Sequence, residues 1–139
     1  MEINIKRLGN AYHLEASNED GLTIQSDASE SIGGGNKAMR PMQILLSSLG
    51  GCSAIDIIHL LNKQRQPLDD IQIKITGERE AHKVPSLFTD IHIHFSLYGQ
   101  IDSKKAERAV ELSMEKLCSV KQILDKTAKI TWSWEVIEE

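Results

Sequence analysis

The sequence predicts an α+β fold in which short strands lie on either side of one long apolar helix. Three observations lead to this prediction. Apolar and polar residues alternate in short segments near both ends of the chain, which is typical of strands with one buried face. Between them an apolar stretch opens with Pro41 and shows no alternation, which indicates a helix. After residue 102, apolar residues recur at three- and four-residue spacing, which indicates a second helical region.

Composition narrows the class of protein. The chain has 139 residues, of which 40% are hydrophobic and 26% charged, so we expect a single folded domain over residues 1–139. A formal net charge of −4 offers no basic face for nucleic acid. The N-terminus lacks the pattern of a secretory signal, and the polar residues Ser47, Asp56 and His59 interrupt the apolar run 44–61. We therefore expect no membrane span and a cytoplasmic location.

The first part of the chain is predicted to be an antiparallel meander. Residues 2–8, 11–17 and 21–27 have the pattern of short strands, and Gly and Asn residues between them supply turns. Residues 29–36 contain three consecutive glycines and are expected to form a loop. No Lys-Ser/Thr pair follows at the spacing of a phosphate-binding loop, so a flexible loop is favoured over a phosphate site.

The central helix is predicted to run from Pro41 to about Arg65, because proline is favoured at the first helical position and Pro67 prevents continuation. Its apolar residues surround the cylinder instead of forming one stripe, which indicates a helix buried on most sides. A 15.5 kDa chain can hardly cover such a helix alone. We therefore predict a homodimer in which a second copy supplies part of the cover.

The second half is predicted to contain a hairpin, a helical region and a final strand over residues 130–136. Asp102 or Ser103 can cap the helical region. Ser119 and Gln122 match a capping box, so a new helix should begin just after Cys118. The strand residues and the apolar side of the helix are, in chain order, Ile71, Ile73, Ile75, Ile91, Ile93, Phe95, Leu97, Ala106, Val110, Met114 and Leu117.

The two cysteines are the first candidates for chemistry. In a reducing compartment they are expected to be free thiols or a catalytic pair. Cys52 follows Gly50 and Gly51 inside the central helix, where glycines permit a close approach or leave space beside the sulfur. Cys118 would lie near the positive end of the helix that Ser119 caps, which favours a thiolate. Either cysteine could instead be an inert core thiol, and both alternatives stay open on these grounds.

Other polar residues suggest weaker hypotheses. His92 and His94 point to one side of a predicted strand and, with His82, could bind a metal, but they continue a polar row that is expected to face solvent. We therefore assign no metal and no cofactor. Asp56 and His59 follow Cys52 by four and seven positions, so they could orient or deprotonate it, or form ordinary hydrogen bonds instead.

Three segments carry a resemblance to a known family. The segment from Arg40 to Ile58, with a proline that opens the helix, a run ending in Gly-Gly-Cys and an Asp four positions later, resembles the central-helix signature of the OsmC/Ohr family. The segment from Met114 to Val120 is similar to the second-cysteine motif of that family. The hairpin around Glu78-Arg79 and residues 87–91 is similar to the OsmC-like branch. These proteins are known as osmotically inducible or organic hydroperoxide resistance proteins.

The resemblance implies an intertwined homodimer with antiparallel sheets around the long central helix. It also implies a cysteine peroxidase that reduces organic hydroperoxides, with hydrogen peroxide as a second substrate, and that an external thiol recycles. Cys52 would attack the peroxide and form a sulfenic acid, and Cys118 would then form a disulfide with it.

This sequence departs from the family at one place. The family's activating glutamate after the proline is absent, since Met42 and Gln43 follow Pro41. Gln43 could still orient a cation, and Arg40 and Arg79 are the candidates for the activating arginine. The alternative function is an inactive relative that binds a small hydrophobic molecule beside Cys52. A thiol–disulfide oxidoreductase is a weaker third, because there is no C-x-x-C motif.

Overall fold

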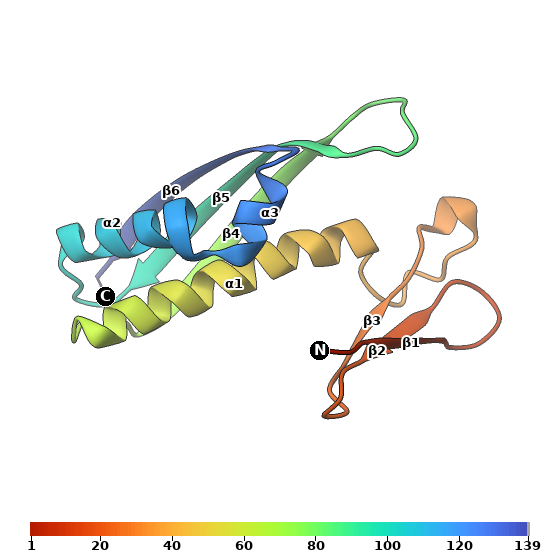
Figure 1. Cartoon of the computed structure of the whole chain (residues 1–139), viewed down its shortest axis with the longest axis horizontal. Coiled ribbons are helices and arrows are strands. Elements are labelled where there is room, and N and C mark those ends of the chain that lie inside the picture. The colour runs from red at the N-terminus through yellow and green to blue at the C-terminus, as the bar shows by residue number, and fades with distance from the viewer. Residues whose placement is uncertain (139) are drawn as a thin grey trace. The chain divides into compact units, whose positions relative to one another are not determined.

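The computed structural model describes residues 1–138 and shows two compact units, Met1–Leu45 and the chain from Leu46 onward. The boundary falls inside the first turns of helix α1 (Pro41–Lys63). Strands, helices and their order are those of an α+β protein, as the sequence predicts (Figure 1). That the chain is a single domain stays a prediction.

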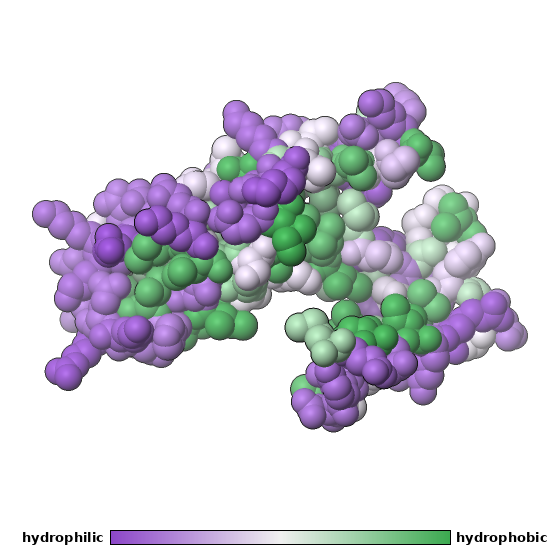
Figure 2. All heavy atoms as spheres, viewed as in Figure 1, coloured by the Kyte–Doolittle hydropathy of each residue, from purple (hydrophilic) through white to green (hydrophobic). Residues whose placement is uncertain are grey.

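The first unit contains a three-stranded antiparallel meander of β1 (Asn4–Arg7), β2 (Leu14–Ser17) and β3 (Thr23–Ser26). Ile5 pairs with Ala16, which pairs with Ile24, so these side chains share one face of the sheet. Ile5 and Ile24 are 65% and 57% exposed, and Ile3 and Leu22 are similarly bare. Hydrophobic atoms are accordingly visible over these strands in Figure 2.

The loop after β3 contains one short 3₁₀ turn, η1 (Glu30–Ile32), and is organised by Asp27. The buried Asp27 carboxylate accepts hydrogen bonds from the backbone amides of Ala28, Gly35 and Lys37. These amides hold the pKa of Asp27 below its usual value, with the Lys37 amide contributing most. The glycine-rich loop thus directs amides at a carboxylate of the protein itself, which agrees with the rejection of a phosphate loop.

The second unit is a helical layer on one face of a three-stranded sheet. Strand β4 (Asp70–Arg79) pairs antiparallel with β5 (Phe88–Tyr98), which pairs parallel with β6 (Lys129–Ile137). Between β5 and β6 the chain forms α2 (Ser103–Leu112), a π-helical turn η2 (Ser113–Leu117) and α3 (Ser119–Leu124). A parallel pair needs such a crossover, and Figure 1 shows its helices on the same side of the sheet as α1.

The core lies between the sheet and these helices. Alternate residues of β5, namely Ile91, Ile93, Phe95 and Leu97, are buried, and their cross-strand partners on β4 and β6 are apolar. Ala106, Val110 and Met114 are buried on the helical side, as their spacing predicts. Leu117 was expected to face the core but is 47% exposed, because the π-helical turn interrupts the helical periodicity before it.

Helix α1 spans Pro41–Lys63, close to its predicted bounds, but the chain covers only one stripe of it. Its buried residues are Leu49, Gly50, Ser53, Ile57 and Leu61. One chain thus leaves much of α1 uncovered, with Ile55 70% exposed, and cover from a second copy stays a prediction. By length and composition alone α1 could cross a bilayer, but the core helix of a soluble protein meets the same criterion, so the expectation of no membrane span stays a prediction.

Candidate functional site

The two cysteines meet where α1 passes the junction of η2 and α3. The sulfur atoms of Cys52 and Cys118 and a carboxylate oxygen of Asp56 all lie within 4.8 Å of one another. We call these three residues the thiol cluster. Both cysteines are free thiols, Cys52 half-buried and Cys118 buried. Residues 66 positions apart in the sequence are thus brought within reach of one reaction.

Helix α1 supplies two members of the cluster. Cys52 and Asp56 are four residues apart, so they lie one above the other on the same helix face. Gly50 lets this part of α1 approach β4, since a Cβ at that position would lie 2.9 Å from a terminal methyl group of Ile75. Gly51 has open space around it. The two glycines therefore have different surroundings, one at a close contact and one beside an open surface.

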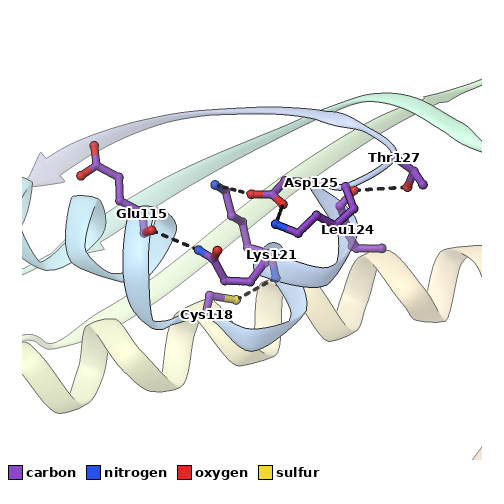
Figure 3. A network of polar contacts seen from close by, with 8 residues as sticks. Glu115, Cys118, Lys121, Leu124, Asp125 and Thr127 are labelled. Carbon is purple, nitrogen blue, oxygen red and sulfur yellow. Dashed lines mark hydrogen bonds and ion pairs between the residues drawn. The ribbon is translucent and has the colours of Figure 1, made fainter.

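The π-helical turn places the third member. The Cys118 amide donates to the carbonyl oxygen of Ser113, five residues earlier, at 2.8 Å. The chain then becomes extended at Cys118, which is the N-cap of α3. The Cys118 sulfur accepts a hydrogen bond from the Lys121 amide at 3.4 Å, as Figure 3 shows. Such single π turns inside helices are frequent at functional sites.

The predicted capping box is wrong in detail, although a new helix does begin after Cys118. The cap is the sulfur of Cys118 and not the hydroxyl of Ser119. Gln122 donates through Nε2 to the carbonyl oxygen of Glu115 at 3.1 Å, instead of reaching back to Ser119. Sulfur is a weak acceptor, so a capping rule based on hydroxyls and carboxylates selected the next residue.

Two buried serines that sequence reasoning missed connect the cluster to its surroundings. The Ser113 hydroxyl donates to Asp56 Oδ2 at 3.1 Å. The Ser53 hydroxyl lies 2.7 Å from the Leu49 carbonyl oxygen and 3.5 Å from the Cys118 sulfur. Among the residues described, no buried side-chain nitrogen or oxygen lacks a hydrogen-bond partner. The signal for Ser113 was available, because it is a polar residue on the buried side of a helix, one position before Met114.

Burial controls the ionisation of Cys118. Desolvation raises its pKa above the ordinary thiol value of 9.0, and it outweighs the Ser53 hydroxyl and the Lys121 amide, which lower it. The neighbouring Cys52 raises it further. The expected helix-end stabilisation of a Cys118 thiolate is therefore the smaller effect. Of the two cysteines, Cys52 is the more accessible residue.

The other residues predicted for the site have local partners of their own. The Arg40 guanidinium donates to the Ala38 carbonyl and to Asn36 Oδ1. Gln43 Oε1 accepts from the backbone amide of Arg40 at 2.9 Å, so it caps the start of α1. Arg79, exposed at the end of β4, donates through Nε to the Ser86 carbonyl oxygen at 3.0 Å. Their action on Cys52 stays a prediction.

The histidines are separate from the cluster. His92 and His94 both hydrogen bond to the Ser133 hydroxyl, and His94 Nε2 lies 3.3 Å from Glu135. His59 is exposed on α1. Within residues 1–138, the group of His, Cys, Asp or Glu side chains that could share one ion is the thiol cluster, which does not include His82.

An apolar groove of about 330 Å³ lies along α1 and β4. Its lining residues are Ser47, Gly50, Gly51, Ala54, Ile71, Ile73 and Ile75. Successive helical residues are rotated by about 100°, so Ser47, Gly51 and Ala54 occupy a side of α1 roughly opposite to that of Asp56. The groove is therefore not the cleft beside Cys52 that the ligand-binding alternative requires.

Comparison with known proteins agrees with this architecture. Residues 34–133 match the family model for OsmC-like proteins, so the chain belongs to the OsmC-like protein family. Protein YhfA of Escherichia coli K12 is 48% identical over 105 residues, which are 74% of this chain and 77% of YhfA.

Solved structures give the same result. A hypothetical protein from Aquifex aeolicus is 33% identical with a TM-score of 0.85, over 99% of this chain and 96% of that chain. A Legionella pneumophila structure described as an organic hydroperoxide resistance protein OsmC and predicted redox protein has a TM-score of 0.71, over 97% of both chains. At 20% identity, this last likeness establishes the fold alone.

The unequal burial of the two sulfurs predicts selective alkylation. Iodoacetamide at pH 7.5 should modify Cys52 well before Cys118, because Cys118 is buried and its raised pKa keeps it protonated. Modification of Cys118 should accelerate only as the pH rises above 9.0, the ordinary thiol value. Peptide mass spectrometry over a pH series measures both rates, with a guanidinium-unfolded sample as the control in which the two rates converge. Faster modification of Cys118 at pH 7.5 would contradict this account.

Proposed function

We propose that the protein is a cofactor-free thiol peroxidase of the cytoplasm that reduces organic hydroperoxides, with Cys52 as the peroxidatic residue and Cys118 as the resolving residue. The observation that carries the proposal is a pair of free thiols within 4.8 Å, one half-exposed and one buried. Membership of the OsmC-like family supports it, because solved structures of this fold include proteins described as organic hydroperoxide resistance proteins.

In the first step the Cys52 thiolate attacks the terminal oxygen of the hydroperoxide ROOH. The O–O bond breaks, the sulfur is oxidised to sulfenic acid, and the alkoxide leaves as the alcohol ROH after taking a proton. Cys52 suits this step because its side chain is partly open while Cys118 is enclosed. Hydrogen peroxide would react in the same way and release water.

In the second step Cys118 attacks the sulfenic sulfur of Cys52. The S–S bond forms, and the hydroxyl of the sulfenic acid leaves as water with one proton. Cys118 must lose its own proton, which burial opposes, and the Asp56 carboxylate within 4.8 Å of both sulfurs is placed to accept it. The Ser113 hydroxyl holds that carboxylate in position. Two equivalents of an external thiol then reduce the disulfide and restore both cysteines.

The proposed activation of Cys52 calls for a nearby cation, because the thiolate is the attacking form and a positive charge beside a sulfur favours it. Arg40 and Arg79 remain the candidates, with Gln43 steadying the start of the helix that carries Cys52. The hydrogen bonds of both guanidinium groups go to neutral oxygens, so each keeps its positive charge uncompensated by these partners. The ligand-binding alternative has less support, because the apolar groove lies on a different side of α1.

We further propose that the working form is a homodimer. Apolar side chains are exposed on both units of a single chain, including Ile5 and Ile24 on the first sheet and Ile55 on α1. Contiguous exposed apolar patches mark interaction surfaces in soluble proteins. A second copy is the occupant that the family resemblance implies, and each copy would bring its own thiol cluster.

Substitution of each cysteine separates the two roles. Cys118→Ser protein should still form sulfenic acid at Cys52 when cumene hydroperoxide is added, because the attacking sulfur is intact. Cys52→Ser protein should consume peroxide no faster than a simple thiol, since the remaining sulfur is buried and protonated. Stopped-flow peroxide consumption and dimedone trapping measure the two outcomes, and Arg40→Ala and Arg79→Ala in the same assay identify the activating cation. Rapid turnover by Cys52→Ser protein would refute the assignment.

The homodimer predicts a mass of two 15.5 kDa chains in sedimentation equilibrium at micromolar concentration. Ile55→Lys should shift the protein toward monomer, because it places a charge on a bare apolar surface of α1. Asn62→Lys, at an exposed polar position of the same helix, is the matched control and should leave the mass unchanged. A monomeric wild-type protein would rule the homodimer out.

A further inference from the structure

The thiol cluster has the composition of a metal site as well as of a redox pair. Two sulfurs and one carboxylate oxygen converge from three points of the chain, and their mutual separations are all below 4.8 Å. We infer that the reduced protein binds Zn²⁺ through Cys52, Asp56 and Cys118, and that zinc is a reversible blocker of the two thiols and not a catalytic cofactor. The inhibitory part of this inference rests on the proposed function, whereas the binding part does not.

The geometry fits zinc with small movements. A tetrahedral ion with Zn–S distances of about 2.3 Å and a Zn–O distance of about 2.1 Å holds its sulfurs about 3.8 Å apart and each sulfur about 3.6 Å from the oxygen. The three ligand atoms already lie within 4.8 Å of one another, so each separation needs to shorten by no more than about 1 Å to match these distances. Cys52 and Asp56 are one helical turn apart, the spacing at which helices present two zinc ligands in metalloproteases.

The fourth position would remain open. Cys118 is buried, while Cys52 and Asp56 are only half-buried, so the exposed side of the cluster is the side of α1. Sites with three protein ligands keep water or another small ligand in the remaining position. Thiolate ligands select zinc over Mg²⁺ and Ca²⁺, which prefer oxygen ligands.

Groups outside the ligands support the same arrangement. The Ser113 hydroxyl donates to Asp56 Oδ2 at 3.1 Å, which orients the carboxylate. The Lys121 amide and the Ser53 hydroxyl lie at 3.4 and 3.5 Å from the Cys118 sulfur, where they stabilise a negatively charged thiolate. Partners of this kind typically contribute about 10–100-fold to metal affinity.

Charge explains why zinc would compete with protons. Two thiolates and a carboxylate carry three negative charges, which a partly buried site does not tolerate without compensation. Zinc replaces two protons and reduces the charge of the cluster to −1. Lys121 on α3 forms an ion pair with Asp125 at 3.0 Å, and its ammonium group lies over the Trp132 ring. Other charged or titratable side chains on these elements, such as Glu115 and Lys116 on η2 and His59 on α1, are exposed.

Oxidation would release the metal. When a hydroperoxide converts the two thiolates to a disulfide, ROOH and two protons become ROH and water, and two of the three ligands lose their negative charge. A disulfide is a poor zinc ligand because the thiolate is the form that binds. Bound zinc would thus slow the oxidation of the two thiolates. Once the disulfide has formed, the zinc ion would dissociate from the site.

The test is a titration of the reduced full-length protein with zinc chloride against a chromophoric zinc indicator. One Zn²⁺ per chain should bind, with affinity rising by up to ~100-fold per pH unit while both thiols are protonated. The disulfide form should not bind zinc.

Cobalt and the variants test the identity of the ligands. Cobalt should give a thiolate charge-transfer band and tetrahedral visible bands. Cys118→Ser should weaken binding by more than ~100-fold and Ser113→Ala by about 10-fold, whereas the control Asp125→Asn, a carboxylate outside the cluster, should match wild type.

The outcomes separate this inference from the peroxidase proposal. Equal zinc binding by the reduced and oxidised wild-type protein would overturn the site without any variant having to fold. Absence of the cobalt thiolate band would also overturn it, even if peroxide is consumed normally. If zinc binds but no disulfide forms with peroxide, the metal site stands and the peroxidase proposal fails. Zinc bound to the reduced protein should slow peroxide consumption, and excess chelator should restore it.

Discussion

The close packing of α1 against the η2–α3 junction is the constraint on which the site depends. Cys52 and Asp56 sit on a rigid helix whose buried stripe is fixed by Leu49, Ile57 and the close contact at Gly50. Cys118 reaches them because a π-helical turn follows α2 and Cys118 itself then has an extended backbone conformation. A regular helix through residue 118 would continue the earlier periodicity and direct this side chain elsewhere. The sulfur pair therefore exists because of an irregularity that the helical core around it holds in place.

Unequal burial then gives the two sulfurs different chemistry. Enclosure of Cys118 raises its pKa and keeps it a protonated, protected thiol, while Cys52 remains partly open. A resolving cysteine benefits from this state, because it does not react with external oxidants and acts only when a sulfenic acid forms beside it. The serines around the pair satisfy its polar neighbours and fix the Asp56 carboxylate. The same hydrogen-bond donors and ligand atoms would suit a zinc ion. Protonation, zinc binding and disulfide formation are therefore mutually exclusive at the two sulfurs.

The sequence predicted the strands and the long helix because their signals are local. Pro41 and Pro67 delimit α1, and alternation identifies β4 and β5 without knowledge of their partners. The parallel pairing of β5 with β6 departs from the antiparallel sheets that the family resemblance implied, and pairing cannot be predicted from local signals because it is a property of the whole fold. Leu117 was misassigned because the π turn shifts the register by one residue, and Ser119 was misassigned because a sulfur cap has no established sequence signal. Cys52 and Cys118 were selected correctly as a neighbouring pair, whereas the serines that connect them escaped notice because buried hydrogen bonds depend on tertiary contacts.

The central claim is that the two cysteines of one chain form a single redox unit. Treatment of the reduced wild-type protein with one equivalent of cumene hydroperoxide, followed by nonreducing digestion and mass spectrometry, tests it directly. The account predicts one linked peptide that joins Cys52 to Cys118 within the same chain, and loss of both free thiols together. Only intermolecular disulfides, or sulfonic acid at Cys52 with Cys118 still free, would contradict it.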